Sequence, residues 1–166
     1  MITDLTTIAQ AAEKNEETNF RFKEFLRNYK GDQIDEMVFE LNNAVSSQVD
    51  CTKCGNCCRS LMINVGEKDT ERLSNHLNIS KKEFEEKYIE KSASGNISVM
   101  KQIPCYFLHD NKCTVYEARP HECREFPGLH KAGFTGRLFA TFMHYGRCPI
   151  IFNVIEKLKE KLNFPE

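Results

Sequence analysis

Four of the chain's eight cysteines fall within one eight-residue stretch, and this stretch constrains the fold more than any other feature. Gaps of two residues let successive thiolates turn toward one ion while backbone amides point at the sulfurs, so zinc and iron–sulfur sites reuse the spacing. Gly55 suits such a turn because it tolerates a positive φ. We therefore predict that the stretch is a tight metal-binding loop, with the cysteines Cys51, Cys54, Cys57 and Cys58.

The other four cysteines complete a proposed set of eight metal ligands: Cys105, Cys113, Cys123 and Cys148. Eight thiolates suffice for two four-coordinate sites. Because Cys57 and Cys58 are adjacent, their side chains diverge, which favours two sites or one bridged site. Alternatively, Cys51, Cys54 and Cys57 with one remote cysteine can hold a cubane iron–sulfur cluster. Two further hypotheses are buried apolar thiols and a thiol redox switch.

Neither the net charge nor the hydropathy gives a reason to expect a nucleic acid or a membrane as partner. Lys and Arg number 23 against 24 Asp and Glu, and a net charge of -1 gives no reason to expect nucleic acid. No apolar run approaches the roughly 20 residues that span a bilayer. The amino terminus lacks the pattern of a secretory signal. We therefore expect a cytoplasmic protein without a membrane partner, whose reduced thiols are free to bind metal.

Apolar periodicity predicts helices at both ends of the chain. Residues 4–29 and 32–45 carry helical stripes and are expected to form a hairpin over 1–50, a scaffold or a face for a protein partner. Proline at position 149 suits the first turn of a terminal helix.

Between these ends the pattern alternates short strands and helices. Helices are expected at 68–77 and after Ser80, where a capping-box pattern begins. Short strands are expected at 61–65, 97–101, 105–108 and 113–116, with a four-residue turn at 109–112. The prediction is a helix-rich α+β fold, in which terminal helices brace a small antiparallel sheet and cysteine-rich metal loops. The expected divisions are 1–50, 51–150 and 151–166.

Several short motifs in this order resemble the YkgJ-type cysteine cluster family, which is described as zinc- or iron-chelating. The motifs are Cys51-x-x-Cys54-x-x-Cys57-Cys58, Pro104-Cys105-Tyr-Phe-Leu108, Cys113-Thr-Val-Tyr116-Glu117-x-Arg119-Pro120 and Cys123-Arg124-x-Phe126-Pro127. The resemblance covers residues 50–150 and implies metal chelation by the matched cysteines. Flagellin lysine methylases carry a similar cluster with an associated iron–sulfur centre, which implies an iron–sulfur enzyme of methyl transfer or redox chemistry as an alternative.

Basic residues near the cysteines are candidates for supporting roles. Arg119 and Arg124 can offset the negative charge of clustered thiolates and hydrogen-bond to sulfur, and Arg59 is a weaker candidate. His121 can support the site or replace a cysteine as ligand, because zinc accepts mixed sulfur and nitrogen sets. The alternatives are surface ion pairs for the arginines and a turn position for His121. We expect a structural or sensory role for the metal, without assigning catalytic residues.

Overall fold

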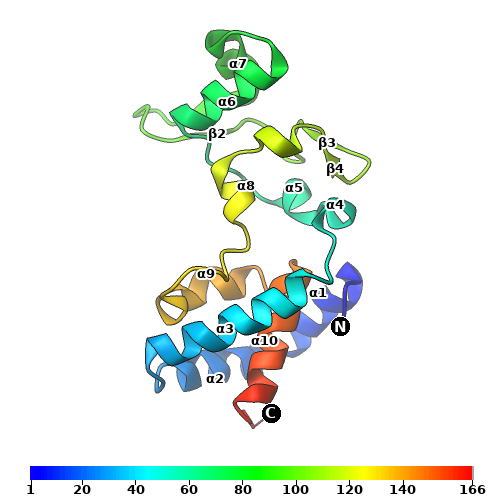
Figure 1. Ribbon diagram of the computed structural model, residues 1–166, viewed down its shortest axis with the longest axis vertical. Coiled ribbons are helices and arrows are strands. Elements are labelled where there is room, and N and C mark those ends of the chain that lie inside the picture. Colours follow the sequence, from blue (N-terminus) through cyan, green and yellow to red (C-terminus); the bar gives the residue numbers. More distant parts are fainter. Residues whose placement is uncertain (166) are drawn as a thin grey trace. The chain divides into compact units, whose positions relative to one another are not determined.

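The computed structural model describes residues 1–165, which form two compact units (Figure 1). We call Met1–Asp50 together with the chain from Pro127 onward the helical unit, and Cys51–Phe126 the cysteine unit. The described residues contain ten α-helices and two small antiparallel sheets, so the helix-rich α+β prediction is confirmed. None of these helices has the length and apolar composition that crossing a bilayer requires. The expected divisions at 50 and 150 stay a prediction.

The helical unit buries its apolar stripes around the last helix. Ile151, Ile155 and Leu158 are completely buried, and their helix packs on α3, which buries Ile34 and Val45. The elements of this unit are α1 (Leu5–Lys14), α2 (Glu16–Leu26), α3 (Gly31–Ser46), the 3-10 helix η2 (Phe134–Arg137), α9 (Leu138–Met143) and α10 (Pro149–Lys161). Pro149 lies in the first turn of α10, as predicted.

The expectation of one helix over residues 4–29 was wrong. Asn15 leaves the helical conformation, with φ -94° and ψ 13°, and serves both as the C-cap of α1 and the N-cap of α2. Its side-chain amide donates a 3.2 Å hydrogen bond to the hydroxyl of Tyr145. A tertiary partner thus stabilises the break, which helical periodicity cannot reveal.

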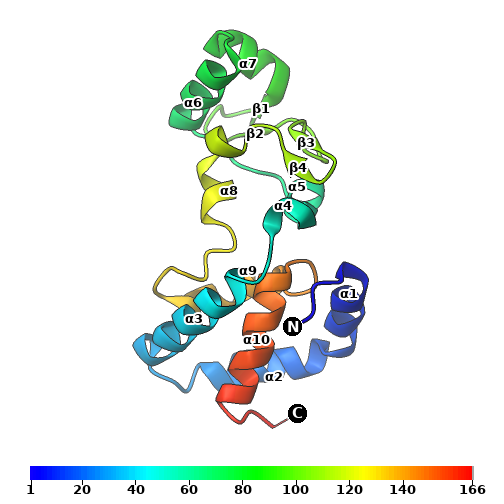
Figure 2. The same ribbon diagram turned by 45° about the vertical axis from the view of Figure 1, so that its right-hand side comes forward.

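The cysteine unit, whose ribbon is seen from a second direction in Figure 2, has its own hydrophobic core. Leu73 and Phe84 are completely buried there, and Cys105 and Cys113 pack against the same core. The elements of this unit are α4 (Cys51–Cys54), α5 (Asn56–Ser60), α6 (Glu67–Leu77), α7 (Lys81–Tyr88), β1 (Ile89–Lys91), β2 (Ser98–Met100), β3 (Leu108–His109), β4 (Lys112–Cys113), the 3-10 helix η1 (Tyr116–Ala118) and α8 (His121–Glu125).

The strands are shorter than the sequence predicts. Strands β1 and β2 pair with Ile89 opposite Met100, and β3 pairs with β4 with Leu108 opposite Cys113. The strand expected at 61–65 is reduced to a single bridge from Asn64 to Val99. Conversely, β1 was not predicted, because Ile89–Lys91 directly continues α7 and lacks a turn signal before it.

Candidate metal centre

The first cysteine stretch folds as two single helical turns, α4 and α5, rather than as the predicted irregular loop. Gly55 separates them in the left-handed region, with φ +58°. A Cβ atom at this position would meet the backbone oxygen of Asn111 at 3.0 Å. Both the dihedral angle and the close approach therefore require glycine here.

Arg59 joins this stretch to the turn of the β3–β4 hairpin. Its Nη1 donates a 2.9 Å hydrogen bond to the backbone oxygen of Cys54, and its Nη2 donates to Oδ1 of Asn111. The hairpin turn itself consists of Asp110 and Asn111, both at positive φ. Two turn residues thus replace the expected four, and asparagine and aspartate tolerate this conformation better than most residues.

Backbone amides point at two of the sulfurs in the hairpin region. The N–H of Phe107 hydrogen-bonds to the Cys105 sulfur, and the N–H of Val115 hydrogen-bonds to the Cys113 sulfur. Each donor lies two residues after its cysteine, so both cysteines have the same local arrangement. Burial outweighs these amides and raises the pKa of both thiols.

Cys57 and Cys58 form a hydrogen-bonded pair of side chains. The Cys58 thiol donates to the Cys57 sulfur, which lowers the pKa of Cys57 to about 7, and the positive charge of Arg59 acts in the same direction. The pKa of Cys58 is raised by this bond, by burial and by the charges of Cys57, Cys105 and Cys113. Adjacent side chains thus lie closer together than the sequence argument assumed.

Cys123 on α8 is electrostatically linked to the same group. Burial is the largest cause of the rise in its pKa to about 12, and the negative charges of Cys57, Cys105 and Cys113 contribute to the same rise. Mutual repulsion of this kind requires the groups to lie near one another, because screening in water suppresses it over longer distances. These effects relate thiols from three separate stretches of the cysteine unit, and we refer to Cys57, Cys58, Cys105, Cys113 and Cys123 together as the thiol cluster.

Arg119 is the cation that faces the cluster from the segment before α8. It lowers the pKa of Cys113 and of Cys123, in both cases against the larger effect of burial. Its guanidinium lies 3.7 Å from the ring centroid of Tyr116, and its Nη1 donates a 2.6 Å hydrogen bond to that residue's backbone oxygen. The side chain is thus fixed on two sides.

A match to a family model covers residues 50–142, which is more than half of the chain. The model is named CxxCxxCC and described as "Putative zinc- or iron-chelating domain". The chain belongs to the CxxCxxCC family. The matched range contains the whole thiol cluster, and membership supports metal binding in general. No solved structure matches the chain.

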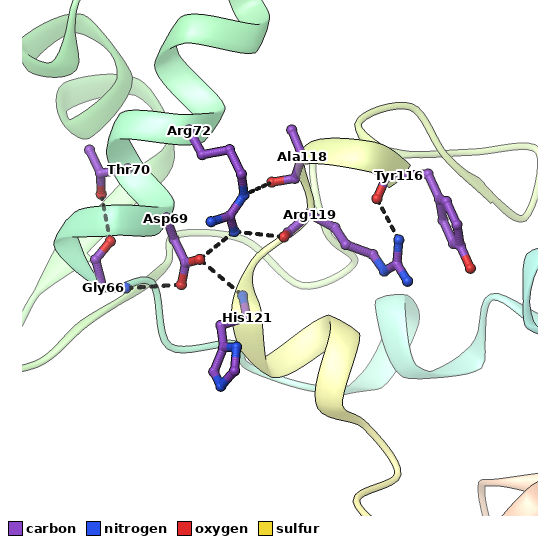
Figure 3. A network of polar contacts seen from close by, with 8 residues as sticks. All are labelled: Gly66, Asp69, Thr70, Arg72, Tyr116, Ala118, Arg119 and His121. Atoms are coloured by element: carbon purple, nitrogen blue, oxygen red, sulfur yellow. Dashed lines mark hydrogen bonds and ion pairs between the residues drawn. The ribbon is translucent and has the colours of Figure 1, made fainter.

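The remaining expected site residues of this CxxCxxCC protein have varied surroundings. Cys51 is exposed and Cys54 half-buried, at the two ends of α4. Cys148 is buried in the helical unit, where it is the N-cap of α10. The imidazole of His121 extends away from the Asp69 carboxylate that binds its backbone (Figure 3). Arg124 lies on α8, where its amide donates to the backbone oxygen of Pro120.

Within the described residues, no three side chains of His, Cys, Asp or Glu are gathered in a geometry that could hold a metal ion. The chemistry of the thiol cluster nevertheless fits a thiophilic cation. Four of its five thiols have raised pKa values. The hydrogen bond to Cys57 is the largest cause for Cys58, burial is the largest cause for Cys105, Cys113 and Cys123, and the negative charges of neighbouring thiols add to the rise. A cation among these sulfurs would remove the repulsion and favour the thiolate forms, which are the forms that bind zinc and iron.

Sequence reasoning did not single out Asn111, Asp69 or Arg72. The Asn111 turn carries a recognisable signal, since Asp-Asn between two short strands favours positive φ. Asp69 and Arg72 lie on α6 outside the cysteine motifs, and their partners are largely backbone atoms.

Proposed function

We propose that the cysteine unit chelates zinc or iron through thiolates, and that the metal has a structural or sensory role. The observation that carries this proposal is the mutual effect of Cys57, Cys105, Cys113 and Cys123 on pKa, because these thiols come from three separate stretches. The amides of Phe107 and Val115 support it, because N–H donors to sulfur favour a thiolate over a thiol.

The proposed ligands are the eight cysteines, with the thiol cluster at the centre. A bound cation requires the sulfurs of the cluster to move from their present positions into one coordination shell. Arg119 would offset part of the thiolate charge, and Arg59 would hold α4 and α5 against the hairpin. Roles for Arg124 and His121 beside the ligands, and ligation by Cys51, Cys54 and Cys148, belong to the same proposal.

Metal binding would also stabilise the fold of the cysteine unit. Its sheets have only two or three residues per strand, and α4, α5 and α8 have five residues or fewer. Such short elements form only when tertiary contacts hold them. A metal that joins the first cysteine stretch, the hairpin and α8 would supply such contacts, so that binding free energy becomes folding free energy.

The deciding experiment is metal analysis of protein purified without oxygen, together with its visible spectrum. We expect stoichiometric zinc or iron, and Cys105→Ser should lose most of it. Met62→Ser is the control, because it removes an exposed sulfur that is not among the proposed ligands, close to the first cysteine stretch. Colourless protein with zinc supports a structural site, whereas strong visible absorption supports the iron–sulfur alternative. Wild-type protein that binds neither metal, even after reduction and reloading, would contradict the proposal.

A thiol redox switch is the second candidate, and the Cys57–Cys58 pair favours it. A thiol with a pKa of about 7 is substantially ionised at neutral pH and is therefore nucleophilic. Its thiolate would attack a peroxide, release water or an alcohol, and form a sulfenic acid. A neighbouring thiol would then displace water to give a disulfide. Metal-free protein in which Cys57 is alkylated no faster than Cys113 would argue against this candidate.

A further inference from the structure

Asp69 is a buried carboxylate of the cysteine unit that lies outside the thiol cluster. Only 6% of its surface is exposed, and it lies in the first turn of α6. Its Oδ1 accepts a 3.0 Å hydrogen bond from the backbone N–H of His121 and pairs with Nη2 of Arg72 (Figure 3). Burial of a carboxylate is costly unless it is paired, so this arrangement is specific rather than incidental.

Arg72 forms further hydrogen bonds to the backbone of the same segment. Its Nε donates to the backbone oxygen of Ala118 at 3.2 Å, and its Nη2 donates to the backbone oxygen of Arg119 at 2.9 Å (Figure 3). Together the two side chains bind three backbone groups within four residues, from the end of η1 to the first residue of α8. The planar guanidinium is suited to this task because its donors have a fixed geometry.

A second anchor holds the following residue. The carboxylate of Glu122 accepts hydrogen bonds from the backbone N–H of Asn64 at 2.8 Å and from its side-chain amide at 2.6 Å. Asn64 lies on the segment that connects the first cysteine stretch to α6. Since α8 has only five residues, its own hydrogen bonds cannot fix its position. These anchors therefore determine where α8 lies.

We infer that Asp69 and Arg72 are positioning residues that hold Cys123 in place as a metal ligand. The inference rests on the proposed function. Its basis is that Asp69 binds the backbone N–H of His121, and that Cys123 lies only two residues further along the chain. Arg72 likewise fixes the backbone of Arg119, whose side chain faces Cys113 and Cys123. Neither Asp69 nor Arg72 binds the metal itself. They act on the ligand through the backbone, as supporting residues of metal sites commonly do.

The test compares the wild-type chain with Asp69→Asn and Arg72→Lys. The first variant removes the charge of the carboxylate. The second keeps a cation beside Asp69 but cannot reproduce the forked contacts to two carbonyls, so it is the variant expected to fold. Glu71→Gln is the matched control, because Glu71 is an exposed carboxylate on the same helix. The probes are Zn²⁺, by competition with a chelator, and Co²⁺, whose absorption reports the number of bound thiolates.

We expect both variants to bind Zn²⁺ about 10- to 100-fold more weakly, the usual effect of losing a residue that supports a ligand. Their Co²⁺ complexes should lose the charge-transfer intensity of about one thiolate out of the four in a tetrahedral site. In the loaded variants, Cys123 should be alkylated faster than Cys105, as read by mass spectrometry. Glu71→Gln should match the wild type in all three measurements.

The outcomes separate this inference from the proposed function. If the wild type binds no metal, the proposed function fails. If the wild type binds metal and Arg72→Lys keeps its affinity, its thiolate count and the protection of Cys123, the proposed function stands and the inference is overturned. Circular dichroism on each variant identifies any loss of helical structure. Should Asp69→Asn unfold, Arg72→Lys alone decides.

Discussion

The backbone N–H of Cys105 donates a 2.8 Å hydrogen bond to the backbone oxygen of Cys58. This bond joins the end of the first cysteine stretch to the beginning of the second, across 46 intervening residues of chain. Arg59 and Gly55 add contacts between the same stretch and the Asn111 turn. Metal binding would therefore act on segments that backbone contacts already bring together.

Gly55→Ala should destabilise the cysteine unit and weaken metal binding. A left-handed backbone costs an alanine about 1–2 kcal/mol, and its Cβ would press on the Asn111 oxygen at 3.0 Å. Chemical denaturation of the metal-free and loaded proteins measures the first effect, and chelator competition measures the second.

Gly136→Ala is the control for this substitution. Gly136 lies in η2, has no positive φ, and has no atom within 4 Å of the position of an added Cβ. Its variant should keep the metal affinity of the wild type. Equal metal affinity in Gly55→Ala and Gly136→Ala would mean that the α4–α5 junction does not shape the metal centre.

Arg59→Lys should lower the affinity for metal although it conserves the charge. A lysine ammonium cannot span the Cys54 oxygen and the Asn111 side chain as the guanidinium does. The expected loss is about 10-fold, at the lower end of the range for residues that support ligands. Chelator competition with Zn²⁺ provides the measurement. Arg27→Lys, at an exposed ion pair on the surface of the helical unit, is the control and should have no effect.

The sequence predicted best those elements that a local pattern of residues marks. The Ser80 signal located the start of α7, where the Ser80 hydroxyl accepts a hydrogen bond from the amide of Glu83, whereas the ligand set derived from the cysteines stays a prediction. Apolar stripes likewise predicted α3 and α10. In each case, the signal in the sequence, a cap or an apolar stripe, lies within one short stretch of the chain.

The features that escaped prediction depend on partners far away in the sequence. The break between α1 and α2 at Asn15 involves a hydrogen bond to Tyr145. Arg72 donates hydrogen bonds to the backbone oxygens of residues 118 and 119. Backbone acceptors carry no residue-specific signal, so no motif could have indicated them. The helical turns of α4 and α5 have only four and five residues, too few for an apolar stripe to be recognised.

Tyr145→Phe should destabilise the helical unit. The hydroxyl of this buried tyrosine donates a 2.7 Å hydrogen bond to Glu156 and accepts one from Asn15, and Glu156 also pairs with the buried Lys159. Removal of the hydroxyl takes away the acceptor of the Asn15 amide and one of the two donors to Glu156, and unmet hydrogen bonds of this kind cost about 1–3 kcal/mol. Thermal and chemical denaturation should show this loss.

The Tyr145→Phe variant should lose stability without losing metal affinity. Tyr145 belongs to the helical unit, so the zinc affinity of the cysteine unit should stay within about twofold of the wild type. Tyr29→Phe, which removes a hydroxyl from a ring packed on Phe25, is the matched control and should cost less stability. An equal loss in the two variants would show that the Tyr145 network contributes nothing specific.

The stability of the metal-free protein should fall as the pH rises above about 9. Burial, together with the charges of other thiols, raises the pKa of Cys123 from 9.0 to about 12 in the folded state. Between these values the folded protein keeps a proton that the unfolded chain has lost. Because the folded state then binds more protons, its free energy of unfolding decreases with increasing pH across this window and is fully retained below pH 9.

Cys123→Ser isolates this contribution, since serine does not titrate in the window. Urea denaturation of both metal-free proteins between pH 8 and 10.5 gives the free energies of unfolding. The two proteins differ at this one side chain, so the difference between the two curves reports the Cys123 thiol. The wild type should lose more stability than the variant as the pH rises. Parallel curves would mean that Cys123 is not buried near other thiols, and Cys123 would then no longer belong to the thiol cluster.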